Sequence, residues 1–174
     1  MHNAALEELG FNWRYLAFDV HPDSLREALN GAKAMKFAGL NLTVPHKILA
    51  VEMMEELDES AREWGAVNTV LFEGENGDGN WQRLWECDPG RVQGIRMRGF
   101  NTDADAITRS IEEDLGIQLE GASVLLLGAG GAGRTAALKL AASGVKSLPL
   151  VNRTQSKAEA VAREIAERGF AIEA

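Results

Sequence analysis

The apolar and polar positions in the first part of the chain alternate between helical and extended patterns. Residues 22–36 carry apolar side chains every three or four positions, which predicts a helix. The short apolar run 40–44 is typical of a strand that ends at Pro45, because proline has no N–H for the next bond of a ladder. Helical spacing returns over residues 46–64, and residues 66–72 favour a strand.

This regular pattern stops over residues 73–98. Glycines and a proline are scattered there among charged residues, so we expect a long loop, anchored by Trp81 and Trp85. Helical spacing resumes over residues 104–115, and Gly116 is the expected end of that helix.

The last part of the chain has the order of a βαβ unit. Residues 123–127 favour a buried strand, residues 134–142 a helix and residues 146–151 a second strand. A third helix is expected over residues 157–168, and residues 170–172 look like the beginning of another strand.

This order of elements predicts an α/β fold with two units. Residues 1–103 would form an open-sheet substrate-binding domain. Residues 104–174 would form the first βαβ portion of a Rossmann-type nucleotide-binding domain. Because open sheets bind ligands at the carboxyl ends of their strands, we expect a cleft between the two units.

The turn between the strand and the helix of the βαβ unit carries a dinucleotide fingerprint. Gly128, Gly130 and Gly133 follow an apolar strand and open a helix. Such glycines let the backbone approach a pyrophosphate, while the helix N-terminus offers free amides and the positive end of its dipole. The alternative is a merely tight turn, which the flanking βαβ pattern disfavours. The sequence therefore predicts a dinucleotide cofactor.

The residues after the second strand indicate which dinucleotide. A carboxylate there would hold the ribose diol of NAD, whereas a cation would accept the 2′-phosphate of NADP. This sequence has Arg153, whose planar fork suits a phosphate, and Lys157 can add a charge one turn later. Both could instead be ordinary solvated cations. Their position favours NADP.

Polar side chains gather at the predicted strand ends of the first half. Amides and hydroxyls donate and accept hydrogen bonds, which suits a ring with several hydroxyl groups. A lysine beside a carboxylate can stabilise a developing alkoxide and pass a proton, and Lys47 and Asp103 would form such a pair. Each residue alone could equally cap a helix or turn, so the prediction depends on the whole set. The set is Asn41, Thr43, Lys47, Asn68, Thr69, Asn101, Thr102 and Asp103.

Charge and composition exclude several classes of function. The chain has 18 Lys and Arg against 26 Asp and Glu, a net charge of −8, and the signs are interspersed, so it offers no broad basic surface for nucleic acid or an anionic membrane. Its single cysteine, Cys87, excludes an internal disulfide framework, and no cysteine and histidine cluster has the spacing of a metal site. The sequence shows no apolar run of about 18 residues and no secretory leader. We therefore expect a cytoplasmic protein with a small-molecule substrate, and the oligomeric state stays open, a homodimer included.

Five runs in order resemble the motifs of the shikimate dehydrogenase family. They are Asn41–Lys47, Gly65–Thr69, Gly99–Asp103, Gly128–Gly133 and Asn152–Thr154. The resemblance extends from Met1 to about Lys157. It implies an NADP-dependent oxidoreductase acting on a CH–OH group, which reversibly reduces 3-dehydroshikimate to shikimate in aromatic amino acid (chorismate) biosynthesis.

The resemblance also implies roles for individual residues. Lys47 and Asp103 would be the catalytic pair, and Thr43, Asn68 and Asp103 would bind the hydroxyls of shikimate. The residues implied to hold NADP are Gly128, Ala129, Gly130, Gly131, Ala132, Gly133, Asn152, Arg153, Thr154 and Lys157.

The chain also departs from the family's pattern. The serine pair that grips the substrate carboxylate, on the family's first strand, would precede Met1, and the rest of the nucleotide domain would follow Ala174. Residues 73–98 are longer than the hairpin expected there, and Ala104 and Ala106 stand where glycines are expected. We therefore expect residues 1–174 alone to have little or no turnover.

Three alternatives to a shikimate dehydrogenase stay open. A quinate dehydrogenase would use the same polar set, and a non-catalytic nucleotide-binding fragment would need only the glycine turn. A glutamyl-tRNA reductase has a similar nucleotide domain but requires a thiol nucleophile. Cys87 has no histidine nearby in sequence to activate it, which makes that reading remote.

Overall fold

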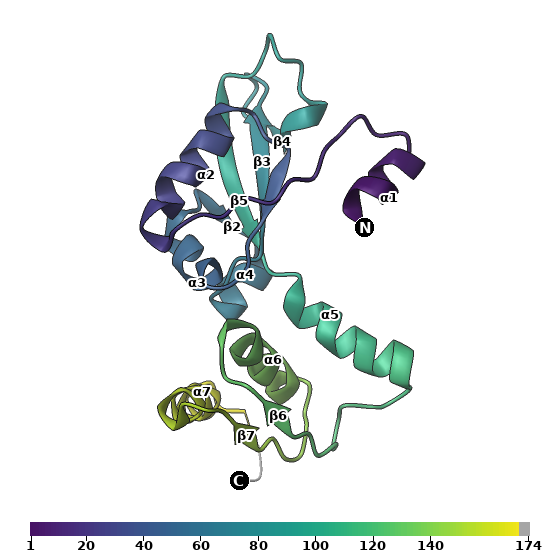
Figure 1. Ribbon diagram of the computed structural model, residues 1–174, viewed down its shortest axis with the longest axis vertical. Helices are drawn as coiled ribbons and strands as arrows, with labels where there is room; N and C mark the ends of the chain where they lie inside the picture. The colour runs from purple at the N-terminus through teal and green to yellow at the C-terminus, as the bar shows by residue number, and fades with distance from the viewer. Residues whose placement is uncertain (171–174) are drawn as a thin grey trace.

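The computed structural model describes residues 1–170, and the strand expected over residues 170–172 extends outside the described residues. Figure 1 shows two bodies stacked along the long axis of the molecule, one built on a five-stranded sheet and the other on a two-stranded sheet. Helix α5 (Asp103–Arg109) runs from the first body toward the second. Helix α1 (His2–Glu8) projects to one side and has no buried residue. The predicted α/β fold is confirmed.

The sheet of the first body is mixed, with strand order β1-β3-β5-β2 and β4 beside β3. All its pairs are antiparallel except that of β2 with β5, which is parallel. The register places Thr69 opposite both Asn41 and Phe100. The ends of β1 and β5 and the start of β3 therefore meet at one edge of the sheet. The strands are β1 (Gly39–Asn41), β2 (Glu56–Leu57), β3 (Thr69–Glu75), β4 (Trp81–Arg83) and β5 (Gly94–Phe100).

Helix α2 (Leu25–Ala34) packs its apolar face against this sheet, after a short 3₁₀ turn at Pro22–Ser24. Leu29 of the helix, Phe72 of β3 and Met97 of β5 are all buried in the same apolar cluster. This outcome confirms the helix expected over residues 22–36. Burial of such side chains is the main source of stability for this body.

The single helix expected over residues 46–64 is wrong. The chain there forms helix α3 (His46–Leu49), a 3₁₀ turn at Ala50–Met53, the short strand β2 and helix α4 (Glu59–Trp64). Backbone bonds to β5 hold residues 55–58 extended, the N–H of Asp58 donating to the carbonyl of Gly99 (2.9 Å). The side chain of Asp58 then accepts from the N–H of Ser60 and begins a new helix. Apolar spacing alone does not reveal such a restart.

The loop expected over residues 73–98 is wrong at both ends, because a hairpin of β3 and β4 begins the stretch and β5 ends it. Strand β3 continues to Glu75, β4 pairs with it, a 3₁₀ turn spans Leu84–Glu86, and β5 begins at Gly94. Buried Glu73 forms an ion pair with Arg96 of β5 (2.7 Å), so these two charges of the stretch belong to paired strands.

The glycines of this hairpin mark close packing as well as turns. Gly77 and Gly79 have positive φ in the turn that joins β3 to β4. A Cβ on Gly74 would lie 2.7 Å from the sulfur of Cys87, so that glycine is required by the side chain packed against it. Trp81 anchors the hairpin, its ring 4.5 Å from the Arg96 guanidinium carbon, whereas Trp85 remains partly exposed.

The second body contains the expected βαβ unit. Strands β6 (Leu126–Leu127) and β7 (Leu150–Val151) are parallel, helix α6 (Gly131–Ala142) connects them, and helix α7 (Gln155–Glu167) follows. Leu138, Leu140 and Ile165 are buried in its core. The strands are shorter than expected, and the buried character expected for residues 123–127 is wrong at alternate positions, since Leu127 is 73% exposed.

Helix α5 ends where the sequence indicated. It continues as a π-helical turn over Ser110–Asp114, and Gly116 with φ of +65° follows. Asp105 of α5 forms an ion pair with Lys139 of α6 (2.8 Å), which ties the helix to the second body. Within residues 1–170, no helix is both long and apolar enough to cross a membrane.

Candidate functional site

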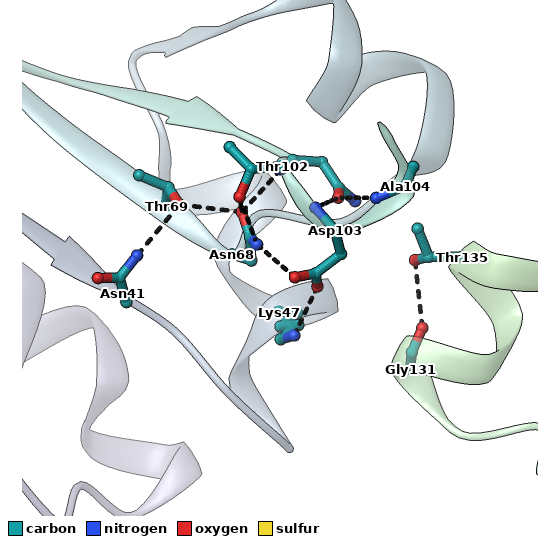
Figure 2. A network of polar contacts seen from close by, with 10 residues as sticks. Asn41, Lys47, Asn68, Thr69, Thr102, Asp103, Ala104, Gly131 and Thr135 are labelled. Atoms are coloured by element: carbon teal, nitrogen blue, oxygen red, sulfur yellow. Dashed lines mark hydrogen bonds and ion pairs between the residues drawn. The ribbon is translucent and has the colours of Figure 1, made fainter. Parts of the chain in front are cut away.

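Lys47 and Asp103 meet at the edge where the strands end. Lys47 lies on α3, directly after the loop that follows β1, and Asp103 opens α5 after β5. The ammonium nitrogen of Lys47 is 2.7 Å from Oδ2 of Asp103, and the two side chains are 15% and 29% exposed (Figure 2). The structure therefore brings together the pair that the sequence singled out. Partial burial strengthens the ion pair and still leaves both groups within reach of a ligand.

Asn68 holds the other oxygen of the same carboxylate. Its Nδ2 donates to Oδ1 of Asp103 (2.6 Å) and to the hydroxyl of Thr102 (2.9 Å). Its Oδ1 accepts from the backbone N–H of Thr102 (3.0 Å). Asn68 is 7% exposed, so these bonds also satisfy a buried amide. Each oxygen of Asp103 thus has its own partner, which fixes the plane of the carboxylate.

Asn101 supports Asp103 through hydrogen bonds to the backbone. Its Oδ1 accepts from the N–H of Asp103 (3.0 Å) and of Ala104 (3.4 Å), and it is 2% exposed. The side chain therefore begins α5 by satisfying two of the free amides at its start. We conclude that Asn101 positions Asp103 through the backbone at the start of α5. The sequence alone could not distinguish this role from direct binding of a ligand.

A line of polar side chains extends the site along the strand ends. The hydroxyl of Thr69 donates to Oδ1 of Asn68 (3.0 Å), and Nδ2 of Asn41 donates to the hydroxyl of Thr69 (3.2 Å) (Figure 2). The hydroxyl of Tyr15 in turn donates to Oδ1 of Asn41 (3.1 Å). Nothing in the sequence indicated Tyr15, because it lies in an extended aromatic segment without helical or strand spacing.

Thr43 stands apart from this network. It is exposed on the loop between β1 and α3, where its backbone carbonyl accepts from the N–H of His46 (2.8 Å). Among residues 1–170 its hydroxyl has no hydrogen-bond partner, so it is free to face a ligand.

A pocket of about 540 Å³ opens beside the junction of β5 and α5. Its lining includes Asn101 and Thr102 together with several carboxylates, but neither Lys47 nor Asp103. The candidate site is therefore defined by the hydrogen-bond geometry around Asp103 rather than by this hollow.

The glycine turn is as tight as the fingerprint predicts. A Cβ on Gly133 would lie 2.1 Å from the carbonyl oxygen of Gly128, so no other residue fits there. Gly128 itself has φ of +110°. The first hydrogen bond of α6 runs from the N–H of Arg134 to the carbonyl of Gly130 (2.7 Å), which leaves the earlier amides of the helix without a helical acceptor.

Asn152 ties this turn to the end of β7. Its Oδ1 accepts from the N–H of Ala129 (3.0 Å), and its Nδ2 donates to the carbonyl of Thr154 (2.7 Å). Arg153 and Lys157 are exposed beside it, and within residues 1–170 neither side chain forms an ion pair. Both cations are therefore available to an anionic group at the mouth of the turn.

Arg134, at the start of α6 just after the glycine turn, links the second body to the first. Its guanidinium donates to both carboxylate oxygens of Glu164 (2.6 and 2.7 Å) and to the carbonyl of Trp64 (2.7 Å). Arg168 donates to the same carboxylate and to the carbonyl of Glu63 (2.6 Å). Burial would raise the pKa of the Glu164 carboxyl, but the hydrogen bonds and charges of Arg134 and Arg168 outweigh it and lower that pKa.

Replacing Glu164 by glutamine will destabilise the protein at neutral pH. The change leaves Arg134 without its bidentate partner, and we expect a loss of about 1–3 kcal/mol in the free energy of unfolding, measured by urea titration at pH 7. Because the folded-state pKa lies below its ordinary value of 4.5, the advantage of the native residue is present above pH 4.5 and disappears as the pH falls further. Glu167→Gln on the same helix is the control. A difference from the native protein that persisted unchanged under strongly acidic conditions would contradict this account.

Two family models match the chain. One, described as the shikimate dehydrogenase substrate binding domain, matches residues 1–70. The other, described as shikimate / quinate 5-dehydrogenase, matches residues 109–173.

The chain is also similar to curated and solved proteins. It is 40% identical over 167 residues to a shikimate dehydrogenase (NADP(+)) of Desulforamulus reducens, an alignment that covers 96% of this chain and 50% of the relative. The chain thus spans about half the length of that relative. The structure of shikimate 5-dehydrogenase from Thermus thermophilus in complex with NADP(H) and shikimate is 35% identical with a TM-score of 0.72, covering 99% of this chain and 56% of that one. A ligand-free 5-ketofructose reductase of a Gluconobacter strain is 32% identical with a TM-score of 0.71, covering 98% and 54%.

Proposed function

Because the chain belongs to the shikimate dehydrogenase family, we propose that it carries the acid–base pair and the cofactor-phosphate site of an NADP-dependent enzyme. The reaction is the reversible reduction of 3-dehydroshikimate to shikimate. Residues 1–103 form the substrate-binding domain in this proposal, and residues 104–174 the first portion of the nucleotide-binding domain. The observation that supports it most is Asp103 held between Lys47 (2.7 Å) and Asn68 (2.6 Å) at the strand ends.

In the proposed mechanism Lys47 is the acid. NADPH, when bound, would supply the hydride that reduces the ring carbonyl of 3-dehydroshikimate. The Lys47 ammonium neutralises the negative charge that grows on the carbonyl oxygen and gives it a proton, so that a C–OH group results. Asp103 keeps the ammonium in place through its 2.7 Å contact and accepts a hydrogen bond from the neighbouring ring hydroxyl. In the oxidation direction the same lysine, once neutral, takes the proton back.

The polar line along the strand ends is assigned to the ring hydroxyls. Asn68 and Thr43 join Asp103 in binding them, since amides and hydroxyls can both donate and accept. Asn68 has its Nδ2 and Oδ1 oriented by Asp103 and Thr102, which fixes its hydrogen-bonding pattern before a ligand arrives.

The glycine turn fits NADP. The N–H groups of Gly131, Ala132 and Gly133 precede the first helical hydrogen bond of α6 and are suited to pyrophosphate oxygens. Because Gly133 has no Cβ, the start of α6 can pack directly against the carbonyl of Gly128, which is the role of the third glycine in this fingerprint. The cofactor-binding residues in this assignment are Gly128, Ala129, Gly130, Gly131, Ala132, Gly133, Asn152, Arg153, Thr154 and Lys157. Arg153 and Lys157 would contact the 2′-phosphate.

A second candidate is the reduction of another polyhydroxy ketone. The likeness to a 5-ketofructose reductase favours it, and the description of the second family model adds quinate as a substrate class. Nothing in the structure supports a glutamyl-tRNA reductase, which needs a reactive thiol. Cys87 is only 8% exposed, and its sulfur donates to the backbone carbonyl of Arg83. A cytoplasmic location and a homodimer stay predictions.

A substrate panel tests the proposal. Residues 1–174 replace the matching half of the Desulforamulus reducens relative, and NADPH oxidation is followed with 3-dehydroshikimate, 3-dehydroquinate and 5-ketofructose. We expect the highest kcat/KM with 3-dehydroshikimate. The unmodified relative is the control for the assay. A clear preference for one of the other ketones would replace the proposed substrate, and NADPH binding without turnover of any ketone would favour a non-catalytic module.

A further inference from the structure

We propose that Tyr15 is a positioning residue of the candidate site, whose hydroxyl holds the amide of Asn41 in one orientation. The orientation of Asn41 is inferred from the hydrogen-bond geometry, and its effect on substrate binding rests on the proposed function. Tyr15 lies outside every motif of the sequence analysis, and no catalytic or binding role was assigned to it.

The hydroxyl of Tyr15 ends a line of hydrogen bonds that begins at Asp103. Its oxygen lies 3.1 Å from Oδ1 of Asn41. Asn41 then donates to Thr69 (3.2 Å), and Thr69 donates to Asn68 (3.0 Å). Asn68 finally donates to Asp103 (2.6 Å). Tyr15 thus lies four hydrogen bonds from the proposed catalytic carboxylate.

The carboxylate of Asp103 determines which group donates and which accepts in each hydrogen bond of this line. An ionised carboxylate only accepts hydrogen bonds, so Asn68 must turn its Nδ2 toward Asp103 and its Oδ1 toward Thr69. The hydroxyl of Thr69 then donates its proton to Asn68 and accepts from Nδ2 of Asn41. Oδ1 of Asn41 is left facing Tyr15, which supplies the one donor it has within residues 1–170. Bonds that all run in one direction strengthen one another.

The effect of Tyr15 falls mainly on Asn41. Asn68 has further partners in Asp103 and the N–H of Thr102, so its orientation does not depend on Tyr15. Asn41 is exposed at the end of β1, and within residues 1–170 its side chain has only Thr69 and Tyr15 as hydrogen-bond partners. In the observed orientation one Nδ2 hydrogen of Asn41 goes to Thr69 and the second can donate to a ligand hydroxyl. Without the phenol, the amide can rotate and offer its carbonyl instead.

Tyr15 is itself held in place by the N-terminal helix. Asn3 of α1 accepts from the N–H of Tyr15 (2.7 Å) and donates to its carbonyl (2.9 Å). The ring of His2 stacks on the tyrosine ring, with centroids 4.3 Å apart and planes 16° apart. Helix α1 has no buried residue, so these contacts through Tyr15 are its visible link to the site. We infer that α1 acts as a support for the orientation of Asn41.

The test is Tyr15→Phe in residues 1–174, read first by NMR of the side-chain amides without ligand. We expect the Asn41 NH₂ resonances to shift and to exchange faster with water, those of Asn68 to change less, and the melting temperature to stay the same. Tyr15 is 41% exposed, so the change to phenylalanine leaves no buried void. Trp13→Phe, a nearby aromatic that contacts Phe11 and Trp85, is the control. Unchanged Asn41 resonances in Tyr15→Phe would overturn the proposal.

A shikimate titration of the chimeric enzyme described under Proposed function, with and without each substitution, gives the functional consequence. Loss of one oriented donor should raise the Kd for shikimate about three- to tenfold in Tyr15→Phe and leave it unchanged in Trp13→Phe. An equal Kd in Tyr15→Phe and the chimeric enzyme with Tyr15 would overturn the role in binding. If the chimeric enzyme with Tyr15 binds no shikimate while the ligand-free amide signals of residues 1–174 respond as expected, the positioning role stands and the proposed substrate is wrong. The two failures are therefore distinguishable.

Discussion

Replacing Lys47 by alanine will lower kcat for 3-dehydroshikimate reduction by about 10²- to 10⁴-fold, with little change in KM. General acid help is worth about that much and is realised mainly in the transition state, where the carbonyl oxygen gains its charge. The lysine is held for this by Asp103 at 2.7 Å. The measurement is steady-state kinetics in the chimeric enzyme described above, with folding checked by circular dichroism.

Asp103→Asn should lose a similar factor, because the lysine then has no carboxylate to orient it. If the two residues act as one unit, the double variant will be far less impaired than the product of the two single losses. Lys33→Ala is the matched control, since Lys33 of α2 also pairs with a carboxylate of the first body, Glu55, which takes no part in the network around Asp103. Losses that multiplied would mean that Lys47 and Asp103 act independently.

Replacing Arg153 by alanine will weaken NADPH binding and leave NADH binding nearly unchanged. The exposed guanidinium has no ion-pair partner within residues 1–170, and a charged bidentate contact to the 2′-phosphate is worth about 1.5–3 kcal/mol. This loss corresponds to a rise in Kd for NADPH of roughly 10- to 150-fold. NADH lacks the phosphate, so it loses nothing by the change.

Nucleotide fluorescence measures both affinities with residues 1–174. Arg163→Ala, on the outer part of α7 and remote from the turn, is the matched control for the loss of one positive charge. If NADPH affinity fell equally in both variants, general electrostatics rather than a specific contact would be the cause. An unchanged NADPH affinity in Arg153→Ala would remove this residue from the cofactor site.

The sequence predicted which side chains of the candidate site lie together better than it predicted the elements around them. Lys47 could be placed because it follows a predicted strand, and open sheets bind their ligands at strand ends. Asp103 could be joined to it because it ends a run of polar side chains of the same kind, although the strand before it was not predicted. Gly133 could be singled out because the spacing of three glycines describes one specific turn. In both cases the residue type and its local position carried the information.

The elements that sequence analysis missed depend on contacts between distant residues. The helix expected over residues 46–64 is interrupted at residues 55–58 because that stretch pairs with β5, much later in the chain. For example, the N–H of Met97 donates to the carboxylate of Glu55, 42 positions earlier. The hairpin over residues 73–98 was hidden because its charges are paired across strands, Glu73 with Arg96, and its glycines meet side chains such as that of Cys87. The contact of Tyr15 with the site could not be predicted, because its hydroxyl bonds to Asn41, 26 positions away in the chain.

Whether Lys47 donates the proton can be measured from the rate of the chemical step in a single turnover. The chimeric enzyme, saturated with NADPH, is mixed rapidly with saturating 3-dehydroshikimate, and the loss of NADPH absorbance in the first turnover is recorded for the native residue and for Lys47→Ala. We expect this first-turnover rate to fall by about 10²-fold or more in the variant, because the proton donor acts in the step that transfers hydride. An unchanged first-turnover rate, with only the concentration of 3-dehydroshikimate needed for saturation increased, would show that Lys47 binds the substrate and takes no part in the chemistry.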